Sequence, residues 1–149
     1  MHAVSMQRMY ECVSAERTAE NLEIEQSKNK GTLVLLEPDA SVRDALSILL
    51  GSEHWQVLTA NDCVGMERAL ADNRVSVVIS ESSLPGCTPG QILQKCQERK
   101  LPVIFTGHEL SLQGAVDLIR EGALDYLEKP FPQDRLVHLL ERIHNRQHN

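Results

Sequence analysis

The sequence predicts a doubly wound α/β fold, in which helices cover both faces of a five-stranded parallel sheet. From residue 31 onward, short apolar runs alternate five times with stretches whose apolar residues recur at helical spacing. Several runs are apolar at consecutive positions, which is typical of strands buried on both faces of a sheet. Strands that alternate with helices in this way form parallel sheets. The length of 149 residues fits one domain, and with only 3% aromatic residues its core has to be aliphatic.

The strands are predicted from their apolar and β-branched content. The first is the run TLVLL at 32–36, and the run VSVVI at 75–79 is the richest in β-branched residues. The complete set of expected strands is 32–36, 55–60, 75–79, 101–106 and 125–129.

Each strand is followed by a predicted helix, the third of which covers residues 91–98. The other helices have a capping residue at the start, or a glycine at the end, or an apolar stripe. The expected caps are Asp39 or Ser41, Asn61 or Asp62, and Ser111, and the expected terminating glycines are Gly51 and Gly122. The residues expected to face inward are Val42, Ala45, Leu46 and Leu49 in the first helix, Val64, Met66, Ala69 and Leu70 in the second, Leu112, Ala115, Val116 and Ile119 in the fourth, and Leu136, Leu139, Leu140 and Ile143 in the last.

Residues 1–30 differ in composition from the rest of the chain. They are polar, contain neither proline nor glycine, and have no continuous apolar stripe. We therefore expect a polar extension, mobile or partly helical, ahead of a domain that covers residues 31–149.

Charge and composition exclude several classes of protein. The net charge of −6 disfavours non-specific binding to nucleic acid or to an anionic membrane. There is no apolar run of roughly 18 residues and no secretory signal, so we expect a cytoplasmic protein. Its four cysteines form no C-x-x-C pair and are expected to be reduced, and its histidines have no metal-site spacing. The cysteines are Cys12, Cys63, Cys87 and Cys96.

Candidate functional residues follow the predicted strands. In a doubly wound sheet, ligands bind beyond the carboxyl ends of the strands, so residues that follow different strands should meet there. No phosphate-binding glycine loop or nucleophile elbow is present. Asp39 could serve only as a helix cap, and Lys129 could simply be solvated. The residues at this edge are Glu37, Pro38, Asp39, Glu81, Ser82, Ser83, Thr106, Gly107, Lys129 and Pro130.

Four segments together resemble the receiver domain of bacterial response regulators, which has a (βα)5 flavodoxin-like fold. VLLEPDASVRDAL at 34–46 is similar to the family's first strand, acidic turn and first helix. VVISESSLPG at 77–86 is similar to its acceptor strand and the loop that follows. PVIFTG at 102–107 and GALDYLEKPF at 122–131 are similar to its fourth and fifth strands. The resemblance covers residues 31–146.

The resemblance implies a signalling chemistry. Receivers accept a phosphoryl group from a histidine kinase on an aspartate at the end of the third strand, with Mg²⁺ held by nearby acidic residues. By position, Thr106 is the hydroxyl and Lys129 the lysine that contact the phosphoryl group. Tyr126 stands at the switch aromatic position, and the Lys129–Pro130 bond is expected to be cis.

This sequence departs from the family pattern at two positions. Counted back from Leu84-Pro85-Gly86, the acceptor position holds Glu81, whose carboxylate lies roughly 1–1.5 Å farther out than that of aspartate. The acidic pair reads Glu37-Pro38, and proline offers no side-chain ligand. Asp39 belongs to the next turn. We therefore expect Mg²⁺ binding to be weak or absent, with no other cofactor and no metal site.

These observations indicate a degenerate receiver, which is not an enzyme and acts by protein–protein interaction. The resemblance implies contact through the face of the fourth helix, fifth strand and fifth helix, with a histidine kinase, an output protein or a second copy, and no contact with nucleic acid or membrane. We expect a Glu81–Lys129 ion pair, Thr106 facing Glu81, and Tyr126 turned inward.

Two alternatives stay open. The receiver could still be phosphorylated, on Glu81 or on another residue. A small-molecule-binding α/β domain could use Glu37, Glu81 and Lys129 to hold a cationic or polar metabolite. The chain could equally be a stand-alone receiver or the front part of a longer regulator.

Overall fold

The computed structural model describes residues 29–108 and 112–148. The extension predicted for residues 1–30 lies outside the described residues except for its last two positions. Cys12 and the cap predicted at Ser111 lie outside them as well.

Five parallel strands form one sheet, as the sequence predicts. The order across the sheet is β2-β1-β3-β4-β5. β2 therefore lies on one side of β1, and the later strands are added in order on its other side. The strands are β1 (Gly31–Leu36), β2 (Trp55–Ala60), β3 (Val77–Glu81), β4 (Val103–Gly107) and β5 (Asp125–Glu128). β3 and β4 begin two residues later than their predicted runs, since residues 75–76 and 101–102 are only half-buried and precede the first paired residues of each strand.

In the described ranges, five helices connect and follow the strands. They are α3 (Ala40–Ser52), α4 (Cys63–Asp72), α5 (Pro89–Gln97), α6 (Leu112–Arg120) and α7 (Gln133–Gln147). Asp39 caps α3 and Asp62 caps α4 with their carboxylates, as predicted. Thr88 and Gln91 form a capping box at the start of α5.

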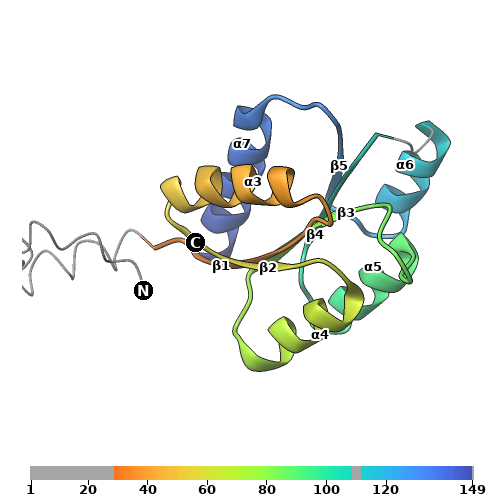
Figure 1. Cartoon of the computed structure of the whole chain (residues 1–149), viewed down its shortest axis with the longest axis horizontal. Coiled ribbons are helices and arrows are strands. Elements are labelled where there is room, and N and C mark those ends of the chain that lie inside the picture. The colour runs from red at the N-terminus through yellow and green to blue at the C-terminus, as the bar shows by residue number, and fades with distance from the viewer. Residues whose placement is uncertain (1–28, 109–111, 149) are drawn as a thin grey trace, which may run out of the picture.

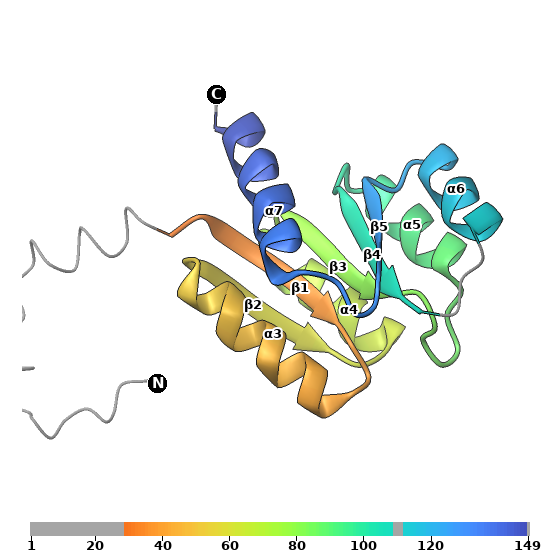
Figure 2. The same ribbon diagram turned by 90° about the horizontal axis from the view of Figure 1, so that it is seen from above.

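The helices form one layer on each face of the sheet (Figures 1 and 2). α3 and α7 cover one face, where they bury Leu46, Leu50, Leu136, Leu139, Leu140 and Ile143. α4, α5 and α6 cover the other face, where they bury Met66, Leu70, Ile92, Leu93, Cys96 and Leu118. Because both faces are covered, the edge at the carboxyl ends of the strands is left for a functional site.

Several predicted inward positions are wrong. Val64 is 63% exposed, Leu112 is 82% exposed and Ile119 is 45% exposed, and Ala45 also faces solvent. In α6 the inward residue is Leu118 instead. These short helices contain more apolar residues than one stripe can hold. Packing against the sheet therefore determines how each helix is rotated about its own axis.

The expectation that the cysteines are reduced is also wrong for one pair. Cys63 and Cys87 form a disulfide, with their Cα atoms 6.2 Å apart. Cys96 is free and buried. A separation of 24 residues carries no pairing signal, and the two cysteines meet because the loop after β3 passes the start of α4. In the described part of the chain, no helix is both long and apolar enough to cross a bilayer.

Candidate functional site

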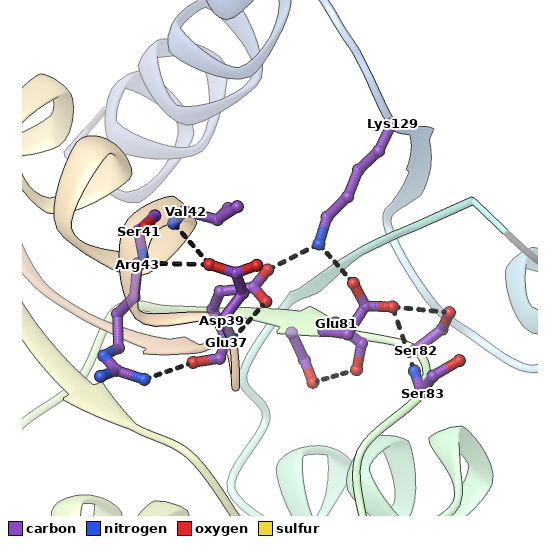
Figure 3. Close-up of polar contacts among 10 residues, drawn as sticks. Glu37, Asp39, Ser41, Val42, Arg43, Glu81, Ser82, Ser83 and Lys129 are labelled. Atoms are coloured by element: carbon purple, nitrogen blue, oxygen red, sulfur yellow. Dashed lines mark hydrogen bonds and ion pairs between the residues drawn. The ribbon is translucent and has the colours of Figure 1, made fainter.

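The candidate site lies at the carboxyl edge of the sheet, where three charged side chains converge (Figure 3). Glu37 follows β1, Glu81 is the last residue of β3, and Lys129 follows β5. Both carboxylates are buried, at 2% exposure for Glu37 and 6% for Glu81. Residues that are 92 positions apart in sequence thus meet at one place, as the strand-end rule predicts.

The ammonium of Lys129 bridges the two carboxylates. Its Nζ atom lies 2.7 Å from Oε1 of Glu37 and also binds Oε1 of Glu81. We call this arrangement the lysine bridge. The predicted Glu81–Lys129 ion pair is therefore present, whereas the second contact, to Glu37, was not part of that prediction.

The environment of Lys129 keeps it protonated. Burial lowers the pKa of the ammonium, but hydrogen bonds from it to Glu37 and Glu81, and the negative charge of both, outweigh burial. The net result is a pKa above the ordinary lysine value. Lys129 consequently carries its positive charge at neutral pH.

The remaining carboxylate oxygens also have partners. Oε2 of Glu81 accepts from the backbone N–H of Ser83 at 3.2 Å and from the hydroxyl of Ser82 at 3.5 Å. Oε2 of Glu37 accepts from the backbone N–H of Asp39 at 3.0 Å. These bonds fix both carboxylates in place before any ligand arrives.

Arg43 is a contributor that sequence reasoning missed. Its Nη1 atom donates to the carbonyl oxygen of Glu37 at 2.8 Å. Arg43 lies in the first turns of α3, where an arginine is ordinarily solvated, so no local signal could have selected it.

The other two residues of the acidic turn, Pro38 and Asp39, are placed differently from Glu37. Pro38 is exposed and offers no side-chain oxygen. Oδ1 of Asp39 accepts from the backbone N–H groups of Ser41 at 2.9 Å and Val42 at 3.2 Å, so this oxygen caps α3. Among the described residues, no group of three or more His, Cys, Asp or Glu side chains is placed to hold a metal ion.

Thr106 and Tyr126 lie beside this network. Thr106 is paired with Glu81 in the register of β3 and β4 and is 2% exposed. Within the described residues, no hydrogen bond joins its hydroxyl to Glu81, whose oxygens bind Lys129, Ser82 and Ser83 instead. The Tyr126 hydroxyl is buried, and a Cβ atom at Gly107 would come within 2.9 Å of it. The side chain therefore points inward over Gly107, as expected.

The Lys129–Pro130 peptide bond is cis, as the resemblance implies. The bond directly follows the residue that bridges Glu37 and Glu81.

Comparisons with known proteins show which family this chain resembles. The model of the response regulator receiver domain matches residues 33–141. The transcriptional regulatory protein FixJ of Bradyrhizobium diazoefficiens is 35% identical over 115 residues, which cover 75% of this chain and 56% of FixJ. The transcriptional regulator NtrC of Escherichia coli K12 is 31% identical over 76% of this chain and 24% of NtrC. The chain thus spans about half the length of FixJ and about a quarter of NtrC.

A solved structure shows the same similarity in three dimensions. The receiver domain of NtrX from Brucella abortus superposes with a TM-score of 0.69 at 29% identity, covering 76% of this chain and 98% of that domain.

Proposed function

Because the chain belongs to the response regulator receiver domain family, we propose that it is a degenerate receiver, which signals through protein contacts without ordinary aspartyl phosphorylation. Receivers of two-component systems are signalling domains rather than enzymes. The observation that carries the proposal is the lysine bridge between Glu37 and Glu81.

The first support is the state of the acceptor position. One oxygen of Glu81 binds the Lys129 ammonium and the other accepts from Ser83. A carboxylate that attacks phosphorus has to be free and aligned with the leaving group, and an error of about 1 Å lowers such a rate steeply. The extra methylene of glutamate and its two partners both oppose this alignment.

The second support is the missing metal donor. Mg²⁺ would have to replace the ammonium between two buried carboxylates, and Pro38 supplies no further oxygen. Mg²⁺ needs near-ideal octahedral oxygen ligation, so its affinity here should be low.

The proposed output is a protein partner that binds the face of α6, β5 and α7. Leu112 and Ile119 of α6 are 82% and 45% exposed, which leaves apolar surface for a contact. The partner classes are a histidine kinase, an output protein or a second copy of the domain. Replacing Leu112 with aspartate should weaken partner capture, whereas the same change at Val64, 63% exposed on α4, should not.

The proposal is tested with a small phosphodonor and Mg²⁺, with intact mass spectrometry as the measurement. We expect the wild-type protein to gain no phosphoryl group. The matched control combines Pro38→Asp with Glu81→Asp, so that both positions return to the family pattern. This variant should gain one phosphoryl group. A phosphoryl group on wild-type Glu81 would overturn the proposal.

Calorimetric titration with Mg²⁺ gives an independent measurement. We expect no binding in the sub-millimolar range for the wild type and tighter binding for Pro38→Asp, because an aspartate there adds a carboxylate ligand. Sub-millimolar affinity of the wild type would contradict the assignment of a degenerate site.

A further inference from the structure

We propose that the Cys63–Cys87 pair is a site of thiol–disulfide exchange that controls the loop leaving Glu81. The inference rests on the proposed function in one respect, since it gives an input to a receiver site that does not take a phosphoryl group. A dithiol reductant is the class of co-reactant that the site would take.

The position of the disulfide carries the proposal. Cys63 is the first residue of α4, and Cys87 lies in the loop 82–88 between β3 and α5. That loop begins directly after Glu81, and Figure 3 shows Ser82 and Ser83 beside the Glu81 carboxylate. The covalent bond therefore joins a neighbouring helix to the loop that follows the acceptor position.

Apart from the disulfide, the loop is held at its start by the N–H of Ser82, which donates to the Thr106 carbonyl at 2.8 Å, and by the buried side chain of Leu84. The N–H of Ser83 donates to Glu81 at 3.2 Å. The N–H of Cys87 donates to the Leu84 carbonyl at 3.5 Å, which is long for a hydrogen bond. Between them, Pro85 and Gly86 are exposed, and Gly86 has a φ of 72°, which favours glycine. Reduction of the disulfide would thus remove the strongest described restraint on the middle of the loop.

The two cysteines differ in exposure. Cys63 is half-buried, while Cys87 is only 7% exposed, so an external thiolate should attack the sulfur of Cys63. Cys87 then leaves as a thiolate and takes up a proton. The second thiol of the reductant attacks the mixed disulfide and releases Cys63. Overall, the protein disulfide is reduced to two thiols, and the dithiol reductant is oxidised to a disulfide.

The domain should stay folded after reduction. Cys87 and Leu84 remain part of the apolar cluster beneath α4 and α5, together with Met66. Cys96 does not compete in the exchange, because burial raises the pKa of its thiol to about 11, with a smaller opposing effect from Arg99. The expected change is therefore local to the loop.

The test uses the full chain with Cys12→Ser, which leaves Cys63, Cys87 and Cys96. Oxidised and reduced protein, equilibrated with a dithiol redox buffer, are alkylated under native conditions and weighed intact. We expect no label after oxidation and two labels after reduction, mapped to Cys63 and Cys87. Label on these two residues after treatment with the oxidised buffer would overturn the proposal.

Amide hydrogen exchange of the same samples measures the consequence. We expect exchange at residues 83–88 to become about tenfold faster on reduction, with β4 unchanged. Cys63→Ser should show the fast exchange in both buffers. Equal exchange of the loop in the oxidised and reduced protein would overturn control of the loop.

Failure of this inference is separable from failure of the proposed function. Neither measurement uses Mg²⁺ or a phosphodonor, so a negative result leaves the degenerate receiver untouched. Phosphorylation of the wild-type protein in both redox states would remove the proposed function without affecting the exchange site.

Discussion

Lys129 is the residue on which the candidate site most depends. It is the shared counter-charge of two buried carboxylates. Replacing it with methionine keeps the side-chain volume and leaves Glu37 and Glu81 facing each other without a cation. We expect a loss of about 3–5 kcal/mol in the free energy of unfolding. Urea denaturation followed by the fluorescence of Trp55, the only tryptophan, measures it. Lys95→Met, which breaks an exposed pair with Glu67, is the control and should cost less than about 1 kcal/mol.

The same residue sets a pH dependence at the alkaline end. The pKa of Lys129 is raised in the folded state, so its stabilising contribution is complete below the unfolded value of about 10.4 and is lost as pH rises through the folded value. The difference in unfolding free energy between wild type and Lys129→Met should therefore be flat in the pH range just above neutrality and shrink only above about pH 10. A difference that already shrinks near neutral pH would contradict the lysine bridge.

Cys96 provides a third measurement on a single residue. Burial raises its thiol pKa to about 11, so almost no thiolate forms near neutral pH. In reduced protein, Cys96 should be alkylated much more slowly than Cys63 under native conditions, and at a similar rate in denaturant. Peptide mapping of a time course distinguishes the two.

At the scale of one element, α3 depends on its cap. The Asp39 carboxylate accepts from two backbone N–H groups at the start of the helix. Asp39→Ala should lower the free energy of unfolding by about 1 kcal/mol, and Asp39→Ser should retain most of it. Neither change should alter Mg²⁺ titration, because Asp39 caps the helix through Oδ1 and is not a ligand in the proposed function. An effect of Asp39→Ala on metal affinity alone would instead assign Asp39 to a metal site.

At the scale of the whole molecule, the disulfide restrains the unfolded chain. It closes a loop with a sequence separation of 24 residues. Reduction should lower the free energy of unfolding by about 3 kcal/mol, mainly because the unfolded chain regains conformational freedom. Thermal unfolding of the Cys12→Ser protein with and without reductant measures the change. In Cys63→Ser, the reductant should have no effect.

The inward-facing residues of a helix were predicted more accurately in the longer helix than in the shorter one. All four inward residues predicted for α7 are buried, because 15 residues give the helical period four turns to appear. In α6, which has nine residues, Leu112 and Ile119 were wrongly placed inward. The pair Glu81–Lys129 followed from strand ends and the resemblance, whereas the Arg43 contact depends on side-chain torsions that no pattern encodes.

By itself the sequence determined the order of the elements, the parallel sheet and the edge at which Glu37, Glu81 and Lys129 meet. It also determined the two departures from the family pattern, Pro38 and Glu81, because the identity of a residue is read directly from the sequence. Only the tertiary structure decided that one ammonium serves both carboxylates and that Cys63 meets Cys87. These contacts join residues that are far apart in the chain, and they form only when packing on both faces of the sheet fixes the rotation of each helix and the path of each loop.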